Sequence, residues 1–193
     1  EITNDGNYAD LAFVNNIFDG ANVEDAAAIF SNRGWDGFLL DNNSFVNYNQ
    51  GPLTPLTDGY YANFSLVFME AQVYTPAGRG NNYVATNNTF EGITHLNALE
   101  AFRWQNVTMS GNDITGTFGR LFVWSYNTDP LVSVNIADNM LALSAGNDTA
   151  TSTGIGVYYA DADVNITGNT VDGANTCINT NGVTDLEITG NNL

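Results

Sequence analysis

Apolar residues and asparagines follow one short pattern that recurs along most of the chain. Two apolar residues lie two positions apart, an asparagine follows three positions after the second, and another apolar residue comes two positions later. In the first copy these places hold Leu11, Phe13, Asn16 and Phe18. The recurring asparagines are Asn16, Asn43, Asn88, Asn112, Asn139, Asn169 and Asn191. Apolar residues two apart predict strands with one side turned inward, whereas a helix would place them three and four apart.

The residue before each recurring asparagine predicts a sharp turn. It is asparagine, glycine or aspartate in every copy, and these residue types tolerate a positive φ angle. Successive copies are separated by 27, 45, 24, 27, 30 and 22 residues. Circuits of this length that turn at the same corner predict a solenoid, in which equivalent strands stack in parallel and the asparagine amides form a ladder.

These asparagine corners resemble those of the pectin-lyase-like superfamily of right-handed parallel β-helices. The resemblance covers residues 11–193 and implies an all-β solenoid of about seven to eight coils with an internal asparagine ladder. It also implies three strands per coil, with the ladder in the turn between the second strand and the third. First strands are then expected near residues 27–31, 66–71, 99–104, 121–126, 155–159 and 176–179. We therefore expect a single β-helix domain over residues 1–193.

Two stretches leave the local structure open. The interval of 45 residues from Asn43 to Asn88 holds either a long loop at 48–61, with Pro52 and Pro55, or one coil that lacks the asparagine. Residues 24–30 form the one run with spacing that also suits a helix.

The charge balance limits the partners of the chain. The sequence has 21 acidic residues and 4 basic ones, a formal net charge of −17, and all four cations are arginines. We therefore expect no binding of nucleic acid and no insertion into a membrane, because a basic surface and a long apolar stretch are both missing. An acidic chain without lysine stays soluble at high ionic strength and attracts cations, which favours an extracellular or cell-surface location. The single cysteine, Cys177, is expected to be a small buried residue.

The expected first strands are rich in aromatic residues. Because alternate residues of a strand face opposite sides, one set of these rings should point outward. The rings expected to form a flat outer face are Trp104, Phe122, Trp124, Tyr126 and Tyr158. Such a face binds sugar rings or another protein, since aromatic residues contribute much of the binding energy at interfaces. The alternative is that a long loop covers these rings or that the strand has the opposite register.

Enzymes of the superfamily that hydrolyse pectin carry Asn-Thr-Asp, Asp-Asp, Gly-His-Gly and Arg-Ile-Lys motifs, and only the first has a counterpart here, at residues 127–129. The lyases use an arginine or lysine base beside calcium that is held by acidic residues. Arg103 and Arg120 lie in or next to expected first strands and are the candidate bases. The simpler interpretation of both residues is an ion-paired or surface arginine.

A glycoside hydrolase needs two carboxyl groups about 5–10 Å apart. Glu100, Asp161 and Asp163 are weak candidates, although a solvated acidic surface explains them more simply. Asp161 and Asp163 also suit a calcium site, the one cofactor that the sequence suggests. His95 is expected to be a loop or core residue.

The sequence favours an extracellular structural or adhesive module, such as a surface stalk or fibre subunit, with glycan binding through the aromatic face. The alternative is a polysaccharide-degrading enzyme, a lyase or a tailspike-like hydrolase, that acts on an acidic glycan. No amphipathic helix precedes the first coil in residues 1–10. We expect the coil ends to be covered by a longer chain or by a second copy.

Overall fold

The computed structural model describes residues 8–22, 27–31, 35–48, 65–71, 81–126, 131–144, 152–161 and 163–193. Over these ranges the regular elements are all β-strands, which form three parallel sheets, A, B and C. Sheet A contains, in spatial order, β1 (Tyr8–Val14), β4 (Trp35–Asp41), β7 (Asn82–Thr86), β10 (Asn106–Ser110), β13 (Ser133–Ala137), β16 (Val164–Thr167) and β19 (Leu186–Thr189).

After each strand of sheet A from β1 to β16, the chain forms one strand of sheet B and then one strand of sheet C. Sheet B contains β2 (Ile17–Asp19), β5 (Ser44–Val46), β8 (Thr89–Ile93), β11 (Asp113–Gly116), β14 (Met140–Leu143) and β17 (Thr170–Asp172). Sheet C contains β3 (Ile29–Ser31), β6 (Ser65–Glu70), β9 (Asn97–Phe102), β12 (Arg120–Trp124), β15 (Thr153–Ala160) and β18 (Thr176–Val183).

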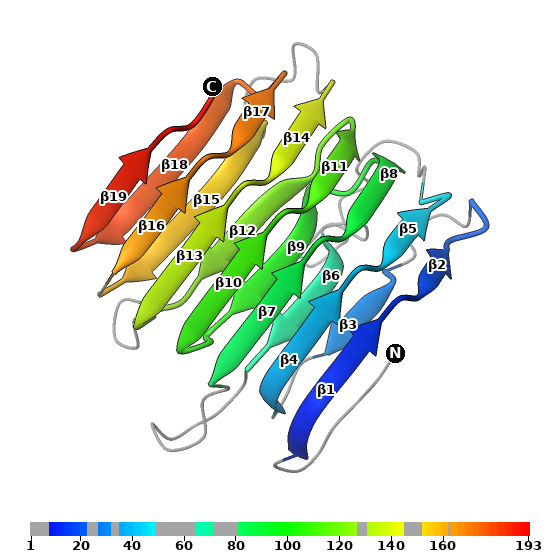
Figure 1. Cartoon of the computed structure of the whole chain (residues 1–193), viewed down its shortest axis with the longest axis horizontal. Coiled ribbons are helices and arrows are strands. Elements are labelled where there is room, and N and C mark those ends of the chain that lie inside the picture. Colours follow the sequence, from blue (N-terminus) through cyan, green and yellow to red (C-terminus); the bar gives the residue numbers. More distant parts are fainter. Residues whose placement is uncertain are drawn as a thin grey trace, which may run out of the picture.

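Each circuit of the chain adds one strand to every sheet. The described strands therefore make six complete coils and the first strand of a seventh. In Figure 1 the strands of sheet A cross the front of the molecule from β1 to β19, and those of sheet C return behind them. The fold is a right-handed parallel β-helix, in which the coils stack as the asparagine spacing predicts.

The corner between sheets A and B has the same geometry in every coil. The residue before each ladder asparagine has a φ angle between 52° and 66°, in the left-handed region that the sequence predicts. The amide Nδ2 of Asn88 donates to Oδ1 of Asn112 at 2.9 Å and to the carbonyl of Leu40 at 2.9 Å. Asn112 Oδ1 also accepts the backbone N–H of Asn88 at 3.1 Å.

These contacts repeat along the whole series of corners, from Asn16 to Asn191. The five ladder residues between these two are buried, namely Asn43, Asn88, Asn112, Asn139 and Asn169. The ladder therefore supplies hydrogen-bond partners to polar groups that water does not reach.

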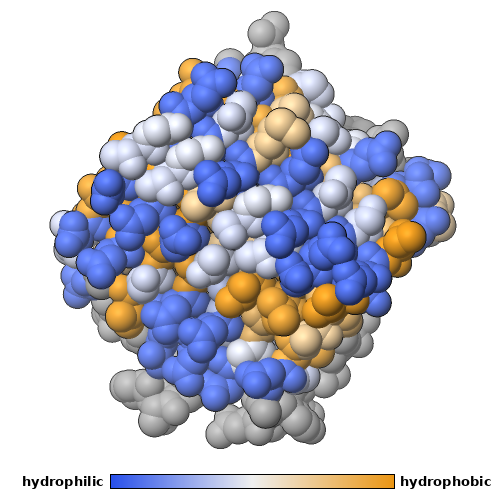
Figure 2. Space-filling view, viewed as in Figure 1, coloured by the Kyte–Doolittle hydropathy of each residue, from blue (hydrophilic) through white to orange (hydrophobic). Residues whose placement is uncertain are grey.

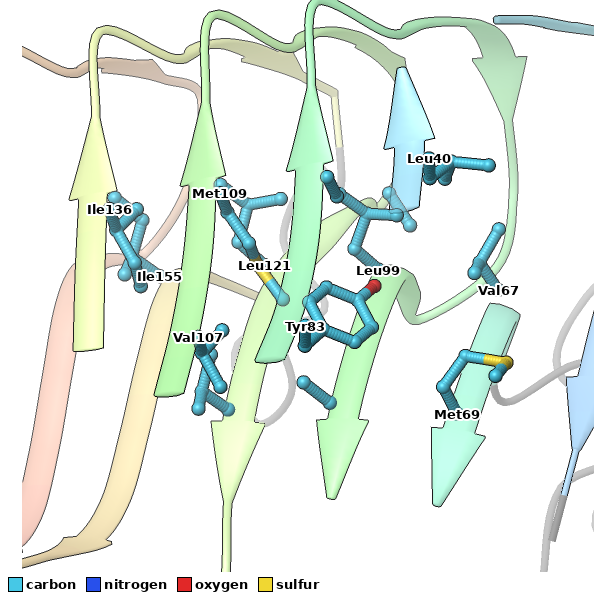
Figure 3. Close-up of a cluster of buried hydrophobic side chains, with 14 of the residues drawn as sticks. Leu40, Val67, Met69, Tyr83, Leu99, Val107, Met109, Leu121, Ile136 and Ile155 are labelled. Atoms are coloured by element: carbon cyan, nitrogen blue, oxygen red, sulfur yellow. The ribbon is translucent and has the colours of Figure 1, made fainter. Parts of the chain in front are cut away.

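Inward side chains fill a continuous apolar lumen. Phe18, Phe45 and Phe90 occupy equivalent places on sheet B and stack with centroid distances of 4.7 and 4.5 Å. Figure 3 shows Tyr83 of sheet A directed toward Leu99 of sheet C, with further aliphatic side chains around them. Burial of this apolar surface is the main force that holds the coils together.

The interval between Asn43 and Asn88 contains one enlarged coil. β4 pairs directly with β7, from Gly37 beside Asn82 to Asp41 beside Thr86, so no additional coil lies between them. Most of the expected loop, including Pro52 and Pro55, lies outside the described residues. In the stretch that also suited a helix, Ile29 and Phe30 belong to β3, whereas residues 24–26 are not described.

Two smaller expectations concern burial and membranes. Cys177 is only partly buried, against the edge of the apolar core, rather than fully enclosed. Over the part of the chain that the structure describes, no helix is long and apolar enough to cross a membrane.

Candidate functional site

The outer face of sheet C gathers aromatic and charged side chains into two adjoining rows. Leu99 and Leu121 point into the lumen (Figure 3), so the residues next to them in these strands point outward. The strand register sets the two rows, which are Phe68, Glu100 and Phe122, and beside them Glu70, Phe102, Trp124 and Tyr158. We call Phe102, Phe122, Trp124, Tyr126 and Tyr158 the aromatic cluster.

The rings of the aromatic cluster pack edge to face as well as in parallel. Phe102 and Trp124, on neighbouring strands, stack with centroids 3.9 Å apart and planes 16° apart. The Phe122 ring is also nearly parallel to Trp124, at 17°, with centroids 6.0 Å apart. Tyr126 stands at 82° to both Phe102 and Trp124. The outer surface is therefore an interlocked group of rings and not the flat face that alternation alone predicts.

Exposure differs across the aromatic cluster. Phe102 and Phe122 are buried, Trp124 and Tyr158 are partly exposed, and Tyr126 is 46% exposed. The phenolic oxygen of Tyr158 accepts a hydrogen bond from Asn179 at 3.0 Å. Trp124, Tyr126 and Tyr158 are therefore the rings of the cluster that a ligand can reach.

The prediction that Trp104 belongs to this outer face is wrong. Trp104 is fully buried, its indole N–H donates to the carbonyl of Met69 at 3.0 Å, and its ring packs edge-on against Tyr83. Arg103 has a φ angle of 64°, and this left-handed residue interrupts the strand alternation immediately before Trp104. The side chain that follows therefore turns into the lumen, and Phe102 takes the outer position.

Glu100 lies at the centre of a hydrogen-bond network on this face. Its side chain is almost fully buried, with 1% exposed. The carboxylate Oε1 accepts the indole N–H of Trp124 at 2.6 Å, and Oε2 accepts Asn97 Nδ2 at 2.7 Å and the Ser65 hydroxyl. Burial raises the pKa of Glu100 above its ordinary value, and the hydrogen bonds and the charge of Arg120 offset only part of that rise.

Both arginines that the structure describes lie at the aromatic cluster. Arg120 Nε donates to Asn97 Oδ1 at 2.7 Å, and its guanidinium carbon lies 3.8 Å from the centroid of Phe122. Burial lowers the pKa of Arg120, and the negative charge of Glu100 opposes that change. The guanidinium carbon of Arg103 lies 4.3 Å from the centroid of Tyr126, within the usual range of a cation–π contact.

The structure brings together three of the five candidate catalytic residues, Glu100, Arg103 and Arg120. Asp161 and Asp163 lie instead at the exposed corner between β15 and β16, on neither row of sheet C. Residues 127–129 lie outside the described residues, and His95 is buried as expected. Within the described ranges, no group of three or more His, Cys, Asp or Glu side chains could hold a metal ion.

Three polar residues of the network were not singled out from the sequence, namely Ser65, Asn97 and Glu70. Glu70 Oε1 lies 3.7 Å from Arg103 Nη1 and forms an ion pair with it. Ser65 and Asn97 are far from each other in the chain, and only the register of β6 against β9 shows that they meet. No local motif marks them.

The outer face of sheet A, which Figure 2 views, has a different character. Figure 2 shows polar and apolar residues mixed on it. Val14 and Leu39, on the paired strands β1 and β4, are 41% and 37% exposed.

The fold and the outer face of sheet C define the class of protein. It is a parallel β-helix with a group of charged and aromatic side chains on the outside of one sheet. No protein-family model, no curated protein and no solved structure matches the chain.

Proposed function

We propose that this chain is an extracellular structural or adhesive β-helix module that binds a glycan through the aromatic cluster. The observation that carries the proposal is the partly exposed indole of Trp124, held on the outer face of a rigid sheet by Glu100 and flanked by the exposed ring of Tyr126. The pectin-lyase-like superfamily, whose asparagine corners this chain resembles, remains our proposal for its ancestry.

Sugars suit this combination of side chains. The C–H faces of a pyranose ring pack on aromatic rings, and its hydroxyls exchange hydrogen bonds with carboxylates, amides and guanidinium groups. At this site Trp124 and Tyr126 supply the rings, while Arg103 and Arg120 supply donors. The strands and the hydrogen-bond network hold these groups in place before binding, so little conformational entropy is lost when a ligand arrives.

The structural part of the proposal concerns the far end of the coil stack. Leu186 and Ile188 on β19 are 40% and 43% exposed, whereas their register partners Val164 and Ile166 on β16 are buried. A further coil would bury this apolar surface, whether it came from a longer chain or from a second copy. Either arrangement produces a longer rod, as expected of a stalk or fibre.

Glycan binding can be tested with matched single substitutions. Trp124→Ala and Tyr126→Ala remove rings of the aromatic cluster, while Met140→Ala removes a side chain that is 49% exposed on sheet B. We expect a glycan panel to yield ligands of the unmodified chain, and Trp124→Ala to weaken their binding about tenfold or more. Binding that responds equally to all three substitutions would place the glycan elsewhere. Circular dichroism verifies that each variant is folded.

One observation favours a second candidate function, a polysaccharide-degrading enzyme. Glu100 is a buried carboxyl group with a raised pKa beside the aromatic cluster, which suits a general acid. Glu70 lies on the neighbouring parallel strand, two positions beyond the register partner of Glu100, a diagonal of about 8 Å between backbone positions. That separation is comparable with the roughly 5–10 Å between the two carboxyl groups of glycoside hydrolases.

The enzymatic candidate predicts products as well as binding. Incubation of the chain with the glycans that it binds should release reducing ends, and both Glu100→Gln and Glu70→Gln should abolish the release. Intact glycans after long incubation, together with tight binding, would exclude this candidate and leave the adhesive module.

A further inference from the structure

Each of the two arginines that the structure describes at this site, Arg103 and Arg120, lies close to one glutamate. Glu70 and Arg103 form an ion pair at 3.7 Å. Glu100 and Arg120 are joined through Asn97, whose Nδ2 donates to Glu100 at 2.7 Å and whose Oδ1 accepts from Arg120 at 2.7 Å. The two acids and the two bases therefore balance each other when all four groups are ionised.

The hydrogen bonds of Glu100 agree with this balanced state. Ser65, Asn97 and Trp124 place three donors around its two oxygens. An ionised carboxylate accepts all three, because it has only acceptor positions, whereas a protonated carboxyl group gives up one of them. These three donors and Arg120 thus favour the ionised form of Glu100, against the effect of burial on its pKa.

The rest of the chain places the site in a negative electrostatic potential. The formal net charge is −17 for the whole sequence, and no lysine contributes to it. A field of this sign lowers the local concentration of anionic ligands and slows their association, most strongly at low ionic strength. Within the described residues, the arginines that would attract an anionic sugar are already compensated.

We propose that the glycan bound by the aromatic cluster is uncharged, and that the site discriminates against uronic acids and sulfated sugars. This inference rests on the proposed glycan binding and names its substrate class. Glu70 acts in it as a specificity-determining residue, because its ion pair cancels the charge of Arg103, which would otherwise pair with a carboxylate or sulfate. Glu100 does the same for Arg120 in its ionised form. The guanidinium groups still serve as hydrogen-bond donors to sugar hydroxyls.

The experiment compares two matched panels at neutral pH and low ionic strength. One panel holds neutral hexasaccharides, and the other holds uronate and sulfated hexasaccharides of the same length. We expect the best neutral ligand to bind at least about tenfold more tightly than any acidic one. Substitution Trp124→Ala should weaken that binding, which locates it at the aromatic cluster.

Charge variants test the assigned role of the glutamates directly. Glu70→Gln leaves Arg103 without its counter-charge, and should raise the affinity for acidic hexasaccharides by about two- to fivefold, the typical effect of one partly exposed ion pair. The gain should shrink when salt is added. Glu91→Gln is the matched control, since it removes the same charge from an exposed position on sheet B.

The outcomes separate the two proposals. Acidic hexasaccharides that bind as tightly as neutral ones, with loss of binding in Trp124→Ala, would overturn the charge inference and leave glycan binding intact. Equal gains in Glu70→Gln and Glu91→Gln would overturn the role of Glu70, because only net charge would then matter. Failure of both panels to bind would overturn the proposed function and this inference together.

Discussion

The indole N–H of Trp124 donates to the carboxylate of Glu100 at 2.6 Å, across the boundary between strands β12 and β9. This bond fixes a large ring on the outside of the β-helix by means of a buried carboxyl group. Because Glu100 also accepts from Asn97 and Ser65, three strand segments share one acceptor. The stability of this face and the glycan binding proposed for it therefore depend on the same residue.

Removal of the Glu100 side chain should destabilise the fold. In Glu100→Ala, the donors of Trp124, Asn97 and Ser65 lose their acceptor, and Arg120 loses its counter-charge. We expect a loss of about 3 kcal/mol in the free energy of unfolding, as is typical when one partner of a buried charged network is removed. Urea denaturation measures the change, and Glu91→Ala, an exposed residue on sheet B, serves as control. Equal, small effects of both substitutions would contradict the role assigned to the network.

The pH dependence of stability should contain a component from Glu100. Its pKa in the folded chain is raised above the ordinary value of 4.5, chiefly by burial. Between that ordinary value and the raised one, the folded chain holds more protons than the unfolded chain, so stability falls as pH rises through this window. Glu100→Gln removes the component. Denaturation from pH 4 upward should therefore show the stability of the original chain falling relative to the variant. A constant difference across this range would contradict the raised pKa.

Interior steps of the asparagine ladder should matter more than terminal ones. Asn112→Ala removes the partner of the Asn88 backbone N–H and of the Ala85 carbonyl, both inside the stack. We expect a loss of about 3 kcal/mol, since buried polar groups without partners cost about 1–3 kcal/mol each. Asn191→Ala, at the last and partly exposed step, should cost clearly less. Thermal unfolding of both variants decides the comparison, and an equal cost would show that the ladder contributes no buried hydrogen bonds.

The left-handed corners predict opposite effects for two substitutions in adjacent coils. Gly168 has a φ angle of 66°, and a Cβ atom there would collide with the Asp138 carboxylate. Gly168→Ala should therefore cost about 1–2 kcal/mol. Asp138→Gly should be neutral or stabilising by up to about 1 kcal/mol, because glycine adopts the observed φ angle of 55° without strain. Destabilisation by both substitutions would indicate that side chains, not backbone strain, decide the preference at these corners.

The sequence predicts the fold well because its signal is local. An asparagine, the turn residue before it and the flanking apolar pairs all lie within a few positions, and the structure confirms each corner from Asn16 to Asn191. The site is less predictable. Trp104 points inward because of the backbone conformation of Arg103, which no side-chain pattern reveals.

The partners of Glu100 depend on contacts between coils. Ser65 reaches it from 35 positions earlier in the chain, on the last strand of the enlarged second coil. The insertion hides the register of β6 from any fixed-period comparison, and the register alone decides which polar residues meet. The sequence therefore predicts Glu100 as a candidate site residue, but it does not predict which residues form hydrogen bonds with it.

The side-chain oxygens of the ladder all face the preceding coil, since Oδ1 of each asparagine accepts from the one before it. The side-chain amides of the stack consequently all point in the same direction along the rod. Two rods brought together by identical ends would oppose oxygen to oxygen or hydrogen to hydrogen. Any lengthening of the rod must then proceed head to tail, so a fibre built in this way would be polar along its entire length.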